Sequence, residues 1–439
     1  MSTFHFPFSI SHSKSGGLLF ALLCSAPLAA QPPVTLEQCR ARAQAAYPLA
    51  RQRGLVEKAL ALSVANLNRG YLPQVSLAAK ASYQSDVTQI PIDFSQVPML
   101  SSVSIPSLSK DQYSATLEVT QSVWDGGAIS AQKTTARAAS ALEARQLEAE
   151  LYALNEKVNQ LYFGVLLVDE QLRQSDLLAE ELRRSYDQTV SYAENGIAGR
   201  ADVDAVRVEQ LNVSQRQAQL RGSRRAYCEM LAALTSLPDS AFASLAKTSG
   251  DLPLRLQPDS LPSLLLLDAQ SRHLDAQKEN IKAASLPKLG LFVQGGYGKP
   301  GLDMLSNEFA PFYVAGARLQ WSFGSLYTQA NERKKIEVRK SAVALQADVY
   351  KLNLDLQKAR LAETIQSLRD MMKMDSDIIA LRESVKKAAE AKVANGTLSV
   401  TELLREVTAE SLARQVRALH EVELMMAVAE YAQLLNGGS

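Results

Sequence analysis

Few side chains in this sequence have the types and spacing that catalysis, metal binding or phosphate binding requires. Of the four His, His5 and His12 lie in a segment interpreted below as a signal peptide, and His273 and His420 are isolated in helical patterns. Residues 295–298 (GGYG) end a strand pattern, but no Lys-Ser or Lys-Thr pair follows them as a P-loop requires. The sequence therefore predicts no catalytic residues, no metal site and no cofactor, and an enzyme is the least expected class.

The three Cys are too far apart in the sequence for a zinc knuckle or a disulfide framework. Cys39 and Cys228 each lie in a helical pattern beside apolar residues, and the sequence leaves open whether they form a disulfide. Residues 1–30 predict a signal peptide, because Lys14 precedes a short apolar run that is followed by small residues. Lipidation of Cys24 is the alternative, which Leu23 disfavours because a small residue is expected before a lipidated Cys.

Charge and composition narrow the class of protein. The chain has 439 residues with 47 Lys and Arg against 46 Asp and Glu, which excludes a generally basic nucleic-acid binder and an acidic disordered chain. Gly (21) and Pro (16) are few, and helix-forming residues dominate, as in proteins built from long helices. No segment has about 18 consecutive apolar residues, so no transmembrane helix is predicted.

The sequence repeats itself once. Residues 66–83 and 280–297 share Asn, Leu-Pro and Tyr at an offset of 214, Trp124 matches Trp321, and the Asn-Gly pair at 195 recurs 200 residues later. Each half therefore has the order helix, strand, loop, strand, very long helix, turn, helix. The predicted divisions are a signal peptide over 1–30, a first repeat over 31–236, a linker over 237–260, a second repeat over 261–436 and a tail over 437–439.

Two very long helices are predicted, over about 127–192 and 325–392. Apolar residues recur at steps of three and four in both, as in coiled-coil seams that need partner helices. In the first helix these are Leu147, Leu151, Leu154, Val158, Leu161, Val165, Val168 and Leu172, and in the second Leu345, Val349, Leu352 and Leu356. Each helix ends at an Asn-Gly pair, so each half is expected to form a helical hairpin with its tip at 195–202 or 395–402.

Alternating apolar and polar residues predict four β-strands. Their length suits strands that cross a bilayer, and also a soluble half-buried sheet. Trp124 and Trp321 at equivalent strand ends favour the membrane, as barrel interface aromatics. Glu118 and Arg318 fall on the polar faces and are candidate pore-lining residues. The predicted strands cover about 74–84, 112–123, 288–298 and 312–323.

Four strands cannot close a barrel, and open sheet edges are not tolerated in lipid. Several chains must then share one barrel, and three chains supply twelve strands and twelve helices. The predicted fold class is therefore mainly α with a small β part. It is a duplicated unit of long antiparallel coiled-coil helices plus four transmembrane strands per chain, which assembles as a trimeric 12-strand β-barrel joined to a 12-helix α-barrel.

This duplicated order over about 34–436 resembles the TolC family of outer membrane efflux and type I secretion channels. The start VTLEQC at 34–39 with Tyr47-Pro48, the Leu-Pro before the first and third strands, and the Gly turn at each tip carry the resemblance. It implies a homotrimer in outer membrane lipid that extends into the periplasm. It also implies two partners, a periplasmic adaptor protein and an inner-membrane RND or ABC transporter, with no nucleic acid, no chemistry and no cofactor.

The resemblance also implies functional residues near the tips. Family members often narrow the periplasmic end with acidic rings, and the matching stretches here are 186–194 and 386–394. The gate candidates are Asp187, Glu194, Lys387 and Glu390, and the alternative is that these are ordinary solvated charges. Lys386 and Lys387 depart from the acidic pattern. The candidates for adaptor contact are Asn195, Gly196, Asp202, Asn395, Gly396 and Glu402.

Two other classes remain as alternatives. A periplasmic coiled-coil adaptor has one helical hairpin flanked by lipoyl-like β halves, rather than two duplicated units. A structural protein of the envelope has no need of four amphipathic strands at repeated positions. Both alternatives therefore explain less of the sequence than an exit duct does.

Overall fold

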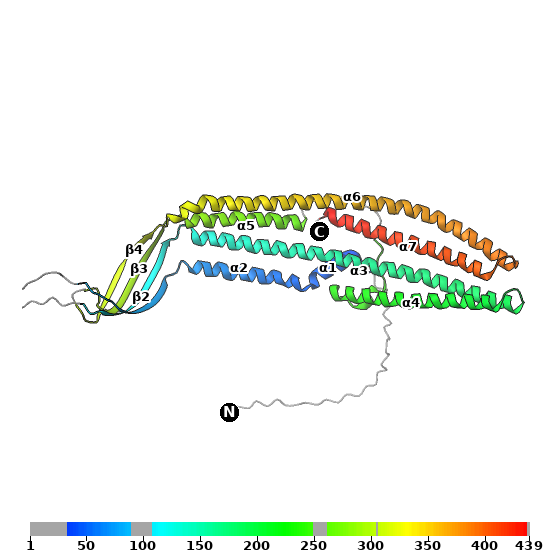
Figure 1. Ribbon diagram of the computed structural model, residues 1–439, viewed down its shortest axis with the longest axis horizontal. Helices are drawn as coiled ribbons and strands as arrows, with labels where there is room; N and C mark the ends of the chain where they lie inside the picture. The colour runs from blue at the N-terminus through cyan, green and yellow to red at the C-terminus, as the bar shows by residue number, and fades with distance from the viewer. Residues whose placement is uncertain (1–32, 89–107, 249–260, 304–305, 437–439) are drawn as a thin grey trace, which may run out of the picture.

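The computed structural model describes residues 33–88, 108–248, 261–303 and 306–436. The molecule is elongated, with a small sheet at one end and two helical hairpin tips at the other (Figure 1). None of the helices in these ranges combines the length and apolar content that a membrane span requires. The predicted signal peptide, Cys24, the tail over 437–439 and part of the predicted linker lie outside the described residues.

The elements follow one order twice. In the first half, a short helix leads through two strands to a very long helix and a return helix, and the second half does the same. The first-half elements are α2 (Gln52–Arg69), β1 (Gln74–Tyr83), β2 (Asp111–Trp124), α3 (Ala128–Glu194) and α4 (Arg200–Thr235). Those of the second half are α5 (Pro262–Ala284), β3 (Lys288–Lys299), β4 (Ala310–Gln320), α6 (Gly324–Ala394) and α7 (Val400–Asn436). The described residues also form three short elements, α1 (Leu36–Ala46), η1 (Pro48–Arg51) and η3 (Asp239–Ala243).

The mainly helical fold class with a small β part is confirmed, and the element bounds lie close to those expected. The fourth strand lies two to three residues earlier than predicted, since β4 begins at Ala310 rather than at 312 and ends at Gln320 rather than at 323. Phe323 already has helical backbone angles, because α6 begins at the next residue. With 67 residues, α3 extends for roughly 100 Å at 1.5 Å per residue.

The four strands form one antiparallel sheet in the order β1-β2-β3-β4. Residues paired across the strands share a face, so the register places Ser76, Glu118 and Gln294 on one side and Leu77 and Leu117 on the other. The sheet therefore has one polar and one apolar face. The outermost strands β1 and β4 leave two open edges in the single chain.

A β-bulge at the end of β2 changes the direction of one residue. The register between β2 and β3 shifts between Ser122 and Trp124, so Trp124 pairs with Leu289. Regular alternation would place Trp124 on the polar face with Ser122. The extra residue instead puts the indole on the apolar face.

The helices α2, α3, α5 and α6 leave the sheet side by side, with α2 and α6 at opposite edges (Figure 1). The apolar seam predicted in α3 faces other helices of the same chain, and Leu154, Val158 and Val165 are buried. The seam predicted in α6 does not, since Leu345 is 65% and Leu352 60% exposed. Residues such as Val343, Leu354 and Leu361 on the opposite face of α6 are buried instead, so α6 has two apolar faces.

The largest core lies at mid-length, where α1 and η3 pack on α3, α4 and α7. The Tyr162 hydroxyl lies 2.9 Å from the Val34 carbonyl oxygen and 2.6 Å from that of Ala246, and so ties two chain segments to α3. Cys39 and Cys228 are both buried in this core as free thiols, so they form no disulfide in this structure.

Candidate functional site: the hairpin tips and the polar face of the sheet

Both hairpin tips use the same turn. Gly196 and Gly396 have positive φ angles of 73° and 68°, which glycine adopts without the steric cost of a Cβ. The side-chain amide of Asn195 donates to the Ser191 carbonyl oxygen at 2.7 Å, and Asn395 donates to Ala391 at 2.8 Å. These two carbonyl groups also accept the backbone N–H of the same Asn residue. The later carbonyl groups of α3 and α6 accept from backbone N–H groups of the turns, such as Gly196 and Gly396.

The return helices begin differently. At the second tip the Glu402 carboxylate accepts from the Ser399 backbone at 3.2 Å, and the Ser399 hydroxyl accepts from the Glu402 backbone N–H at 3.2 Å. At the first tip Asp202 accepts from the Gly199 N–H at 2.9 Å, but Gly199 has no side chain to complete the box. The start of α4 is therefore the less tightly capped of the two.

The four predicted gate residues, Asp187, Glu194, Lys387 and Glu390, are all exposed near the tips. No ion pair among the described residues joins any two of them. The structure places the two on α3 and the two on α6 in different hairpins of one chain.

Lys386 is where the structure differs most from expectation. The sequence pattern groups it with Lys387 as a cation of the narrow end, yet its side chain is only 14% exposed. Its ammonium group lies 2.7 Å from the Glu181 carboxylate on α3 and 2.6 Å from that of Glu410 on α7. Lys386 therefore joins the two hairpins. Arg414 binds the same Glu410 carboxylate, at 2.8 Å.

The charges of this cluster stabilise one another. Burial alone would lower the pKa of Lys386, but its hydrogen bonds to Glu181 and Glu410 outweigh burial and raise it. Burial alone would raise the pKa of Glu410, but hydrogen bonds from Lys386 and Arg414 lower it. Sequence alone gave no signal for Glu181, and the only local hint was the four-residue spacing of Glu410 and Arg414.

An apolar core lies beside this cluster and joins both hairpins. Leu182 on α3, Val206 on α4, Val393 on α6 and Leu404 on α7 are all buried in it. The tip halves of the two hairpins therefore pack as one unit.

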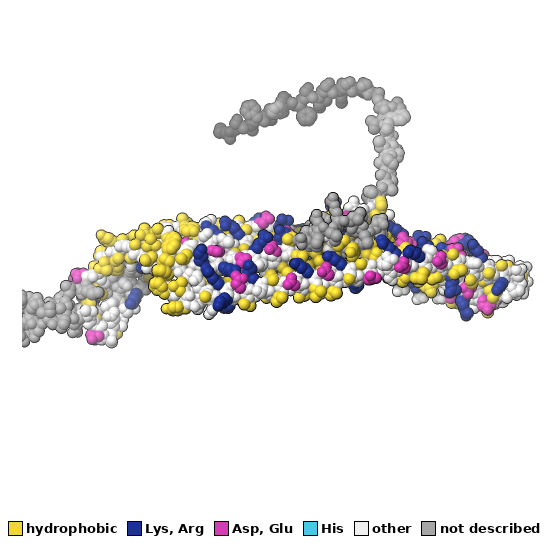
Figure 2. Space-filling model, turned by 90° about the horizontal axis from the view of Figure 1, so that it is seen from above, with side chains coloured by type: hydrophobic (Ala, Val, Ile, Leu, Met, Phe, Trp, Pro, Cys, Tyr) yellow, Lys and Arg dark blue, Asp and Glu magenta, His cyan; other side chains and the backbone are white. Residues whose placement is uncertain are grey.

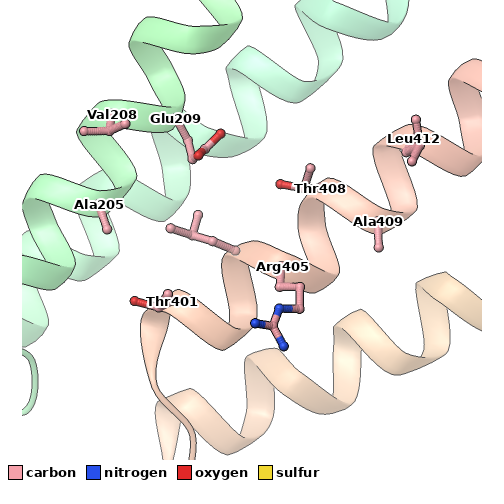
Figure 3. A pocket seen from close by; sticks show the side chains of 9 residues that line it. Ala205, Val208, Glu209, Thr401, Arg405, Thr408, Ala409 and Leu412 are labelled. Carbon is pink, nitrogen blue, oxygen red and sulfur yellow. The ribbon is translucent and has the colours of Figure 1, made fainter.

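A groove between α4 and α7 opens close to the tips (Figure 3), with a volume of about 570 Å³. Glu209 points from α4 into the space between the helices, whereas Arg405 points away from α4. Four of the nine lining side chains are Ala or Thr, and these small residues leave room for a helix to approach. The lining residues are Ala205, Val208, Glu209, Thr401, Leu404, Arg405, Thr408, Ala409 and Leu412.

On the polar face of the sheet, the two predicted pore-lining residues come together. Arg318 on β4 reaches across β3 to Glu118 on β2, with 3.6 Å between guanidinium and carboxylate. On the way the guanidinium lies 4.8 Å from the ring centroid of Phe292. Sequence analysis placed both charges on polar faces, but their pairing depends on the strand order.

Two phenylalanines on the polar face lie over glycines of the neighbouring strand. Phe292 pairs with Gly316, and Phe312 pairs with Gly296. A Cβ atom on Gly296 would lie 2.4 Å from the Phe312 ring. The glycines therefore make room for the rings, an arrangement that protects exposed backbone.

The apolar face has aromatic residues at both ends. Trp124 and Trp321 lie at the helical end, where the Trp321 indole donates to the Ser285 carbonyl oxygen at 3.1 Å. Tyr113 and Tyr297 lie at the far end, each beside the ring of Phe309. Figure 2 shows hydrophobic side chains gathered around the junction of sheet and helices, whereas both signs of charge mix along the helical body.

His420 is not isolated, contrary to expectation. Its Nδ1 lies 2.7 Å from the Asp375 carboxylate, and both side chains are largely buried between α6 and α7. Within the described ranges, no three His, Cys, Asp or Glu are grouped so that they could hold a metal ion.

Comparison with known proteins gives a consistent result. Residues 41–236 match the model of a family described as outer membrane efflux protein. The fold is similar to that of CusC, in a study of transmembrane channel formation, with a TM-score of 0.67 and 14% identity over 92% of each chain. No curated protein sequence matches the chain.

Two further structures have the same fold. The outer membrane protein VceC of Vibrio cholerae has a TM-score of 0.65 and 14% identity, over 92% of this chain and 96% of its own. The outer membrane channel CmeC of Campylobacter jejuni has a TM-score of 0.64 and 12% identity, over 92% and 86%. At these identities the likeness concerns the fold.

Proposed function

We propose that three copies of this chain form the exit duct of a tripartite efflux or type I secretion system. Residues 41–236 match the outer membrane efflux protein family, and the fold over 92% of the chain is similar to that of CusC. The observation that carries this proposal is the amphipathic sheet. Its apolar face is exposed in the single chain, with Tyr313 at 79% and Leu77 at 77%. A face of this kind needs a covering, and lipid supplies one along the whole face.

The height of the apolar face supports this covering. From Tyr113 to Trp124 the chain of β2 extends for roughly 35 Å along the strand. A strand tilted by about 40° then spans roughly 27 Å, close to the apolar band of about 25 Å in outer membrane barrels. The aromatic residues at both ends of the face lie where the two lipid interfaces would be.

The two edges of the chain support a homotrimer. An exposed stripe of apolar residues on α6, called the α6 stripe, lies on the edge of the molecule where β4 lies. Leu55 and Leu62 on α2 are also exposed and lie on the opposite edge, where β1 lies. When copies are arranged in a ring, the α6 edge of each copy meets the α2 edge of the next, and the open edges of β4 and β1 pair at the same time. The exposed α6 stripe consists of Val338, Leu345, Val349, Leu352 and Leu356.

The tips and the adjacent groove are the proposed docking place of a periplasmic adaptor. A helical hairpin with small and apolar residues along one side fits the groove between α4 and α7. Of the six tip candidates, Asp202 and Glu402 lie in the first turns of α4 and α7, close in the sequence to the groove residues Ala205 and Thr401. The other four lie in the two turns that precede these helices. In this proposal, an inner-membrane transporter of the RND or ABC class supplies the energy for export.

The periplasmic gate is proposed to lie at the same end. Asp187 and Glu194 on α3, with Lys387 and Glu390 on α6, remain the candidates for its charged lining. Opening requires the two hairpins to move relative to each other or to those of neighbouring copies. The cluster around Lys386 resists the first of these movements.

Conductance in planar bilayers tests the proposal. The detergent-purified protein is expected to give small discrete steps that grow in Asp187→Ala and Glu194→Ala. Glu150→Ala, on α3 but far from the tip, is the control. If the conductance steps are equally small in the wild type and in both tip variants, the duct remains supported but its constriction lies elsewhere. A folded protein that is soluble without detergent and never inserts would contradict the duct and leave a periplasmic coiled-coil protein.

A further inference from the structure

The charges on the polar face of the sheet are unbalanced. By the strand register, the charged residues of this face are Lys80, Glu118, Lys288 and Arg318. Three of them are cations and only one is a carboxylate. The opposite face has its charges, Asp111 and Lys299, at the far end only.

The single carboxylate is already neutralised. Glu118 has Arg318 at 3.6 Å, and this guanidinium also covers the ring of Phe292. One oxygen of Glu118 is shielded from solvent and accepts no hydrogen bond among the described residues. The Glu118 charge is thus compensated by Arg318 and contributes little to the electrostatic potential at the polar face.

The other two cations have no such partner. Within the described residues, neither Lys80 nor Lys288 forms an ion pair, and both are exposed. Lys80 pairs with Ser114 near the far end of the sheet, and Lys288 pairs with Gln320 near the helices. The uncompensated positive charges therefore lie at both ends of the polar face.

We propose that Lys80 and Lys288 make the lumen of the barrel prefer anions over cations. This inference rests on the proposed function, which turns the polar face toward the pore. In a ring of three copies, the same two cations recur around a water-filled channel with low-dielectric walls, which strengthens their field. Solutes that carry a carboxylate, sulfate or phosphate group are then the class favoured at this end of the duct.

Charged thiol reagents measure this potential without relying on the gate at the tips. Ser114→Cys places a thiol directly opposite Lys80 on the polar face, whereas the native Cys39 and Cys228 are buried. In liposomes, the rates of modification by an anionic and a cationic methanethiosulfonate are compared. We expect the anionic reagent to react several-fold faster after correction for the intrinsic rates with a free thiol.

Second-site variants test whether Lys80 causes the difference between the two modification rates. Adding Lys80→Gln to Ser114→Cys should bring the rate ratio close to one. Lys299→Gln, which removes a cation from the apolar face, should leave the ratio unchanged. A ratio at or below one in Ser114→Cys, or a ratio that Lys80→Gln does not alter, would overturn the inference.

A further variant separates this failure from failure of the proposed duct. Leu117→Cys lies on the apolar face of the same strand and should be shielded by lipid from both reagents. If Leu117→Cys reacts while Ser114→Cys does not, the polar face is not the pore wall, and the proposed function itself fails. If only Ser114→Cys reacts but with no preference, the duct remains and the charge selectivity is wrong.

Discussion

Lys386 owes its environment to the convergence of three helices. Carboxylates from α3 and α7 both lie within 2.7 Å of its ammonium group, and the Glu410 side chain is only 6% exposed. Truncating one partner of a buried charged cluster leaves the others without compensation, which costs more than the pair contributes.

Replacing Lys386 should therefore loosen the tip. We expect Lys386→Ala to lower the free energy of local unfolding there by about 2–3 kcal/mol, below the full value for a buried pair because Arg414 still supports Glu410. Amide hydrogen exchange in α6 and α7 near residue 386 measures it. Lys387→Ala is the matched control, since Lys387 is exposed. Equal effects of both variants would contradict the assigned role of the cluster.

The same cluster should depend on pH. Because the pKa of Glu410 is lowered below its ordinary value of 4.5, its contribution is complete above pH 4.5 and is lost as the pH falls through the lower folded-state pKa. The pKa of Lys386 is raised above 10.5, so its contribution is complete below pH 10.5 and is lost as the pH rises through the higher folded-state pKa.

The measurement compares the wild type with Glu410→Gln. Their thermal unfolding midpoints should differ at pH 7. The difference should begin to shrink below pH 4.5 and disappear as the pH falls through the lower folded-state pKa of Glu410. A difference that stays constant down to pH 2 would exclude titration of Glu410 as the cause.

The sequence indicates the charged residues Glu118, Arg318 and Lys386 but not their partners. The pattern along β2 and β4 was enough to place Glu118 and Arg318 on polar faces. Their ion pair, like that of Glu181 with Lys386, joins residues about 200 positions apart. Such pairs follow from strand order and helix packing, which no local spacing encodes.

Among the elements, the sheet is the one that periodicity predicts best, because alternation has a period of two and the structure keeps it. The bulge at Ser122–Trp124 is the exception, since one extra residue reverses the side on which Trp124 lies. The prediction of an interfacial Trp depended on its position at the strand end, and the bulge supplies the orientation.

Neighbouring glycines in β3 give a test of the polar face. A Cβ on Gly296 meets the Phe312 ring, whereas Gly295 has open space on the apolar face. We expect Gly296→Ala to displace the ring and destabilise the sheet by about 1–3 kcal/mol. Gly295→Ala should have little effect. Heat-dependent migration on gels compares the two, and equal loss of the folded form in both would refute the assigned faces.

At the scale of the whole molecule, the α6 stripe is the main clue to assembly. The heptad spacing predicts the same for the seams of both long helices, namely faces that need partner helices. The structure separates them, because α3 finds its partners within the chain and α6 does not. This difference arises from the order of the helices, with α3 in the middle and α6 at the edge.

A charge in this stripe should block assembly. Leu352→Asp is expected to leave the protein as monomers, because burial of an unpaired carboxylate in an apolar contact is costly. Gln346→Asp adds the same charge about a quarter turn away from the stripe and should assemble normally. Light scattering in detergent gives the oligomeric state, and a trimer of Leu352→Asp would contradict the proposed contact.

The two unlike edges also have a genetic consequence. Each contact in the proposed ring uses the α6 edge of one copy and the α2 edge of the next, so a copy damaged at α6 still offers an intact α2 edge to a healthy neighbour. Such a copy is recruited but cannot close the ring. An allele that encodes Leu352→Asp should therefore be dominant over the normal gene, whereas an allele that prevents folding altogether should be recessive.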